Sequence, residues 1–342
     1  MRPFTLLFVS GACFAAITPM AEPSVSFDRK EIAFVSGGDI WTAPLQGGEG
    51  RLLLSHSANE SRPMFSPDGK RLAFLSNRDG ASNIYVLELA TGAIRRLTYS
   101  DSSEILDGWS RDAEFVYFSS SAGDVAGTSD IYRVRGTGGT PVKVSADRYA
   151  SEFHAAPTPD GKKLLFVARG FGATQWWRKG RSHLDESEIW MLDEAATVKD
   201  QMLLGRGAKQ LWPQWMPDGK AFYFVSDRLG GQQNIHLFTM GKGEKAVTAF
   251  TSGRVLFPSL STDGKALVFE RDFAIWRLDT ATGKAEKIAI TLRGAPAGPD
   301  LSNRVTVSGF SGLEVSPDGK KVALVARGEV WAAAKDGGEA FR

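Results

Sequence analysis

The densest group of side chains that could bind a ligand lies in one stretch of the chain, residues 170–187. Adjacent tryptophans, three cations, a histidine and two acidic residues occur there: Trp176, Trp177, Arg178, Lys179, Arg181, His183, Asp185 and Glu186. Arginine can bind a carboxylate through two parallel hydrogen bonds, and tryptophan supplies apolar contact area. We therefore predict that this loop binds peptides or proteins. The alternative is that the tryptophans pack onto the fold while the charged groups are solvated.

Catalytic chemistry is not indicated by any recognisable motif. The four histidines, His56, His154, His183 and His236, are far apart and lack metal-ligand spacing. The patterns H-E-x-x-H, G-x-S-x-G and the phosphate-binding P-loop do not occur, and the stretch beginning at Gly309 fails the second of these at Leu313. The sequence therefore predicts no catalytic residue, no metal and no cofactor. Carboxylates that only the fold brings together would escape such a search.

The candidate loop is part of a chain built from repeats. In Ser66-Pro67-Asp68-Gly69-Lys70, proline presets φ, aspartate can bind its own backbone and glycine accepts left-handed geometry, so a tight turn is predicted. The apolar run that follows predicts a strand. The turn aspartate recurs at separations of 40 to 58 residues, as Asp28, Asp68, Asp112, Asp160, Asp218, Asp263 and Asp318. We predict a structural role for these aspartates.

A second signature follows each turn, namely a small or acidic residue, then Ile or Val, and usually an aromatic residue. Asp39-Ile40-Trp41 and Glu188-Ile189-Trp190 are examples. Short strands repeated at this period predict an all-β fold, a β-propeller of four-stranded antiparallel blades. Six blades are complete and a seventh repeat is incomplete, and a seven-bladed ring is the alternative. The expected layout is a signal peptide at 1–21, a six-bladed propeller at 22–290, a linker at 291–309 and the seventh repeat at 310–342, which either starts a second propeller or closes the ring incompletely.

The beginning of the chain has the pattern of an export signal. Arg2 precedes an apolar stretch, residues 4–17, that is too short to span a bilayer, and Ala21 precedes the expected cut. Ser10 stands where a lipoprotein box has Leu or Val, so no lipid anchor is expected on Cys13, the only cysteine. We predict a periplasmic or secreted bacterial protein without a membrane span. With 41 basic and 39 acidic residues, the chain has no charge excess suited to nucleic acid.

The S-P-D-G-K turn, the apolar strand and the D/N-I-W/Y signature together resemble the propeller repeats of TolB and of tricorn-type proteases. The resemblance covers essentially everything after residue 22. The stretch from Gln175 to Arg181 is similar to a W-x-R-Y-R-G-G loop of tricorn-type first propellers, but the aromatic is missing at Lys179-Gly180. In that family a second propeller, a PDZ-like domain and a serine-peptidase domain follow. The resemblance implies a catalytic part beyond Arg342.

From this resemblance we expect an exported propeller module that binds or gates peptides for a downstream peptidase domain. Its partners would be peptides, proteins and its own C-terminal peptidase domain. The alternative is a TolB-like periplasmic platform that binds proteins. A stand-alone propeller enzyme is a third reading.

Overall fold

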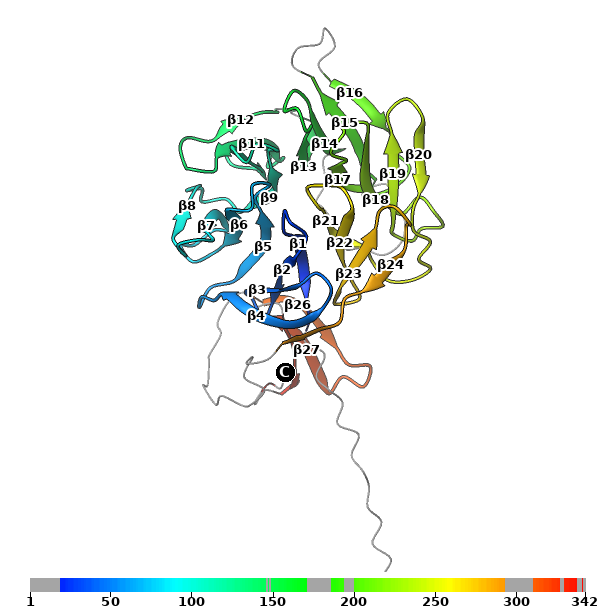
Figure 1. Ribbon diagram of the computed structural model, residues 1–342. Helices are drawn as coiled ribbons and strands as arrows, with labels where there is room; N and C mark the ends of the chain where they lie inside the picture. Colours follow the sequence, from blue (N-terminus) through cyan, green and yellow to red (C-terminus); the bar gives the residue numbers. More distant parts are fainter. Residues whose placement is uncertain are drawn as a thin grey trace, which may run out of the picture.

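The computed structural model describes residues 19–145, 147, 149–170, 186–193, 200–292, 310–326, 329–336 and 340. The regular elements of these residues are β-strands, and they form six sheets of at least four strands around a common centre and one further three-stranded sheet (Figure 1). The predicted all-β propeller is therefore confirmed. The predicted signal up to residue 18 and the linker from residue 293 lie outside the described residues.

Each of the six blades is an antiparallel sheet whose strands follow one another in the chain. The first blade contains β1 (Ala21–Val25), β2 (Glu31–Ser36), β3 (Asp39–Pro44) and β4 (Gly48–Leu54). The second contains β5 (Glu60–Phe65), β6 (Arg71–Ser76), β7 (Asn83–Glu88) and β8 (Ile94–Arg96). The third contains β9 (Glu104–Trp109), β10 (Phe115–Ser120), β11 (Asp130–Arg135) and β12 (Val142–Lys143).

The remaining blades repeat this order. The fourth contains β13 (Ala150–Pro157), β14 (Leu164–Gly170), β15 (Glu188–Leu192) and β16 (Asp200–Leu204). The fifth contains β17 (Gln210–Trp215), β18 (Ala221–Ser226), β19 (Asn234–Thr239) and β20 (Gly243–Ala246). The sixth contains β21 (Leu256–Leu260), β22 (Ala266–Arg271), β23 (Ala274–Asp279) and β24 (Ala285–Lys287).

The two sequence signatures meet inside each blade. A phenylalanine of the second strand lies opposite the residue that follows the Ile of the second signature, as Phe74 does opposite Tyr85. The six phenylalanines are Phe34, Phe74, Phe118, Phe166, Phe224 and Phe269, and all of them are buried. Blades are covered on both faces by their neighbours, so both faces of these strands are apolar and contribute to the core. Burial of one such ring stabilises the fold by roughly 1.5–3 kcal/mol.

The turn aspartates all make the same local contact. Oδ1 of Asp68 accepts hydrogen bonds from the Ser66 hydroxyl and from the backbone N–H of Lys70, 3.1 Å away. The contact with the backbone N–H two residues further on recurs at Asp28, Asp112, Asp160, Asp218, Asp263 and Asp318. Such a side-chain bond replaces a backbone bond and favours the turn over a continued strand.

The ring closes between the first and the sixth blades. The inner strand β1 contacts both β5 and β21, which is the neighbour relationship expected for six blades. After β24 the chain crosses to the first blade, where β25 (Ile290–Leu292) pairs in parallel with the outer strand β4. Two β4 residues pair with β25 as Ile290↔Gly48 and Leu292↔Gly50, so the segment after the sixth blade joins the outer edge of the first blade.

The folded chain begins upstream of the predicted cut after Ala21. Met20 is buried among residues of the first and sixth blades, and its N–H donates to the carbonyl of Phe273 at 3.0 Å. The carbonyl of Pro19 accepts from the Ser36 hydroxyl. Residues 19–21 therefore belong to the seam between these two blades.

The seventh repeat forms a sheet of its own. It contains β26 (Phe310–Val315), β27 (Lys321–Ala326) and β28 (Glu329–Ala334), and in the described part of the chain these strands pair only with one another. Its first strand is exposed along its whole length, including Leu313 and Val315. Its described residues repeat the turn and the first three strands of a blade.

Candidate binding channel

The loop predicted to bind ligands lies almost entirely outside the described residues, which end at Gly170 and resume at Glu186. Seven of the eight candidates, Trp176 to Asp185, are therefore not placed. Oε2 of Glu186 accepts a hydrogen bond from the N–H of Gly207, 3.2 Å away, in the connection between β16 and β17. This contact fixes the end of the loop at the junction of the fourth and fifth blades.

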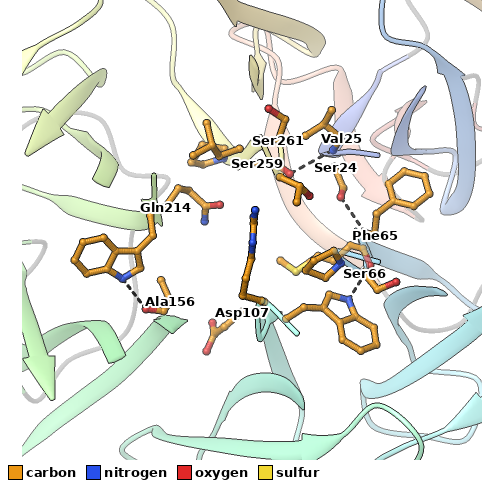
Figure 2. A pocket seen from close by; sticks show the side chains of 18 of the residues that line it. Ser24, Val25, Phe65, Ser66, Asp107, Ala156, Gln214, Ser259 and Ser261 are labelled. Atoms are coloured by element: carbon orange, nitrogen blue, oxygen red, sulfur yellow. Dashed lines mark hydrogen bonds between the residues drawn. The ribbon is translucent and has the colours of Figure 1, made fainter. Parts of the chain in front are cut away.

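The structure shows a different candidate site, a cavity of about 170 Å³ at the centre of the ring. It is lined by the inner strands of all six blades, which carry Ser24, Phe65, Asp107, Ala156, Gln214 and Ser259 at its wall (Figure 2). Figure 2 shows these residues arranged around a common centre. Residues that are 40 or more positions apart in the sequence thus share one channel.

A β-bulge near the middle of the inner strand shapes the channel wall. Five inner strands place a non-glycine residue in the left-handed region at the bulge, with φ between 49° and 55°: Glu22, Arg62, His154, Trp212 and Phe257. This conformation costs an L-residue on the order of 1–3 kcal/mol. A strained backbone persists only where surrounding contacts hold it in place, and such residues cluster at functional sites. The recurrence of this strain in five strands around one channel therefore indicates a binding site.

The left-handed residues turn their backbone N–H groups toward side chains of the preceding blade. The N–H of Arg62 donates to Oε2 of Glu22, and the N–H of His154 donates to Oδ1 of Asp107 at 3.0 Å. The N–H of Trp212 donates to Nδ1 of His154 at 3.3 Å. The bulges therefore provide the polar contacts that connect one blade to the next.

The same type of hydrogen bond connects the first blade to the sixth, where the ring closes. The N–H of Glu22 in the first blade donates to Oε2 of Glu270 in the sixth, 3.2 Å away. Nearer the channel, the Ser259 hydroxyl accepts from the N–H of Val25, and Ser24 accepts from the N–H of Phe65 (Figure 2). A buried N–H without a partner is costly, so these contacts stabilise the boundaries between described inner strands, which belong to separate sheets.

The carboxyl groups of this ring sit in an unusual electrostatic environment. Burial raises the pKa of Asp107 to about 7 and the pKa of Glu270 to about 7. It raises the pKa of Glu22 as well, while the positive charge of Arg62 works in the opposite direction. Burial also lowers the pKa of His154 well below its usual value, which keeps the imidazole neutral and lets Nδ1 accept the Trp212 N–H.

The sequence did not reveal the left-handed residues around the channel, because they share no residue type. One signal was available: a proline follows four of the five left-handed residues, at Pro23, Pro63, Pro213 and Pro258. Proline inside a strand pattern indicates an edge or a bulge, and its recurrence at one register favoured a bulge.

Among the described residues, no group of three or more His, Cys, Asp or Glu side chains is arranged to hold a metal ion. The described part of the chain also contains no helix that is long and apolar enough to cross a bilayer.

Fold and channel together define a β-propeller whose inner strands enclose a polar, aromatic-walled cavity. The family model of the tricorn protease N-terminal beta propeller domain matches residues 19–284, and the chain belongs to this family. The matched range contains all six blades apart from the outer strand β24 of the sixth, and leaves out the β26–β28 sheet.

Individual proteins agree with this assignment. The chain is 26% identical over 315 residues to tricorn protease homolog 1 of Streptomyces coelicolor, a match that covers 90% of the chain and 28% of that relative. The crystal structure of the tricorn protease superposes with a TM-score of 0.65 at 20% identity, covering 93% of the chain and 30% of that structure. A putative TolB from Agrobacterium tumefaciens has a TM-score of 0.55 at 21% identity, covering 80% of the chain and 89% of that structure. The chain thus spans less than a third of the length of the tricorn relatives.

Proposed function

We propose that this chain is a peptide- or protein-binding propeller module that works as the N-terminal part of a tricorn-like periplasmic peptidase. The central channel is the observation that carries the proposal. Its wall is built from all six blades and contains charged, hydroxyl and aromatic groups, and its volume of about 170 Å³ suits a peptide segment rather than a folded domain. Sites of this composition bind ligands through apolar contact and a few placed polar groups.

The expected propeller range of 22–290 is extended to 19–292, because residues 19–21 lie in the seam and β25 pairs with β4. Residues 293–309 connect the propeller to a further repeat at 310–342, and the peptidase domain lies beyond Arg342. Export to the periplasm or the medium is supported by the charged and apolar pattern of residues 1–21. The loop carrying Trp177 and Arg178 supplies a second contact for the same ligands.

A TolB-like platform is the second candidate function. The likeness to the putative TolB favours it, because that match covers 89% of the other chain rather than a fraction of a larger enzyme. Such a platform would bind folded envelope proteins on a face of the propeller and would not need the channel.

A retention experiment separates the two. The full chain is immobilised and exposed to a tryptic digest of casein, and the retained peptides are counted by mass spectrometry. Gln214→Trp, which narrows the channel, should abolish retention, because Gln214 lies at the channel wall (Figure 2). Val142→Trp is the matched control, since Val142 is exposed on the outer strand β12.

Equal retention by both variants would contradict a channel-binding function. If the chain and both variants retained folded envelope proteins but no casein peptides, the platform would be the correct reading.

A further inference from the structure

The charged side chains at the wall of the central cavity are Arg62, Arg111 and Asp107. Two are cations, and burial raises the pKa of the third to about 7. The wall therefore carries a net positive charge near neutral pH, although the whole chain is close to neutral at +2. A positive, partly desolvated cavity concentrates anions.

Arg62 is held toward the channel by its backbone and by an aromatic ring. Its φ of 50° belongs to the bulge of β5, and its guanidinium carbon lies 4.7 Å from the centroid of the Phe257 ring. Stacking on an aromatic face leaves the edge of a guanidinium group, where its N–H donors lie, free to bind. The geometry thus points these donors along the channel wall.

Most of these donors lack a protein acceptor among the described residues. Nη2 of Arg62 donates to the carbonyl of Leu106 at 3.3 Å, and the guanidinium forms no salt bridge with a carboxylate of the described residues. An arginine has five N–H donors in a planar fork that matches a carboxylate. A half-buried guanidinium group with one protein acceptor is suited to a ligand whose oxygen atoms accept the remaining hydrogen bonds.

The acids around Arg62 are engaged elsewhere. Glu22 accepts from the N–H of Arg62, Glu270 accepts from the N–H of Glu22, and Asp107 accepts from the N–H of His154 and from a serine hydroxyl. Each carboxyl therefore stabilises a blade boundary rather than the guanidinium. Their charges reach Arg62 only through space.

We propose that the central channel binds a ligand carboxylate on the guanidinium of Arg62. The ligand class is a peptide that presents either its free C-terminus or an acidic side chain to the channel. The choice of a peptide rests on the proposed function, whereas the carboxylate site rests only on Arg62 and the cavity. Trp109 and Trp215 line the same cavity and supply apolar contact for the neighbouring residue.

The test uses the full chain and fluorescein-labelled tetra-alanine in two forms, one with a free C-terminal carboxylate and one amidated. A third, amidated peptide with a single glutamate distinguishes a side-chain carboxylate from the C-terminus. Anisotropy titrations measure the three affinities. Acetate serves as a probe of the carboxylate alone: a thermal shift assay compares the melting temperature in sodium acetate with that in sodium chloride at equal ionic strength.

Arg62→Gln should weaken the free-acid peptide by about tenfold or more, which is the range of a charge-assisted hydrogen bond. It should leave the weaker amidated peptide unchanged. Arg206→Gln is the matched control, because Arg206 pairs with Glu188 on the exposed surface. If Arg62→Gln does not fold, Gln214→Glu is the second variant. It keeps the side-chain size and adds a negative charge to the same wall, so it should lower the affinity of the carboxylate-bearing peptides only.

The outcomes separate this site from the proposed function. Peptides that bind regardless of a carboxylate, with no specific acetate shift, overturn the site and leave the function standing. An acetate shift that Arg62→Gln removes, without any peptide binding, supports the site and overturns the peptide function. Absence of both overturns both.

Discussion

The backbone N–H of His154 donates to Oδ1 of Asp107, 3.0 Å away in the neighbouring blade. The bond exists because His154 is left-handed, at φ 55°, which turns its amide out of its own strand ladder. Strain in one blade is thus offset by a hydrogen bond to the next. A residue that would prefer an extended backbone at this position would lose both the bond and the closeness of the two blades.

Stability should depend on pH in the direction set by the buried carboxyls. Burial raises the pKa of Asp107 to about 7, so the folded chain keeps a proton that the unfolded chain releases near pH 4. The free energy of unfolding should therefore fall as pH rises from about 4 to 7, by up to about 1.4 kcal/mol per pH unit for each such group. Urea unfolding at pH 5 and pH 7.5 measures the difference.

Asp107→Asn should flatten this pH dependence, since the amide does not titrate. Asp112→Asn is the control. A hydrogen bond from Ser110 lowers the pKa of Asp112 in the folded chain, so the stability that Asp112 contributes is lost only as the pH falls below its pKa in the unfolded chain. An unchanged slope in Asp107→Asn would show that this carboxyl is ionised in the folded chain.

The turn aspartates should be structural. Asp68→Ala removes two hydrogen bonds within the turn and should cost about 0.5–2 kcal/mol of unfolding free energy, comparable to the loss of a helix cap. Asp318→Ala makes the same change in the separate β26–β28 sheet and should leave the main unfolding transition in place. If Asp68→Ala folded with full stability but bound no ligand, the turn would have to be reassigned as a site.

The seam of the ring can be tested with two glycines. A Cβ at Gly47 would lie 2.7 Å from the carbonyl oxygen of Ala289, which leads into β25, while a Cβ at Gly92 would meet nothing within 4 Å. Both residues are left-handed, so alanine costs each about 1–2 kcal/mol of strain. Gly47→Ala should be the more destabilising by a further 1 kcal/mol or so, because it also displaces β25. If chemical denaturation showed the same decrease in unfolding free energy for Gly47→Ala and Gly92→Ala, β25 would contribute nothing to the stability of the ring.

The loop at 170–187 should affect binding more than folding. Trp177→Ala combined with Arg178→Ala removes an aromatic and a cationic anchor, each worth roughly 2 kcal/mol when central to an interface. Peptide affinity should drop while the melting temperature barely moves. A double variant that melts several degrees lower and binds normally once folded would show that the loop packs against the propeller.

Residue types predicted the parts of this fold that depend on local chemistry. The aspartate turn, the apolar second strand and the isoleucine of the second signature each have a local physical cause, and the structure has them in every blade. The left-handed residues themselves did not predict the inner-strand bulges, because Glu22 and Trp212 adopt the same backbone for reasons that lie in the neighbouring blade; the only local signal was the proline that follows four of the five. The channel site was hidden for the same reason, since its charges come from strands that only the closed ring brings together.

The pairing of β25 with β4 also has a consequence for solubility. An unpaired sheet edge is a template for other chains, and long edges are the most dangerous. Among the described outer strands, β4 is the longest at seven residues, whereas β8, β12 and β24 have two or three. Pairing with β25 covers Gly48–Gly50, the first three residues of this edge, so removal of residues 290–292 should promote self-association of otherwise folded protein.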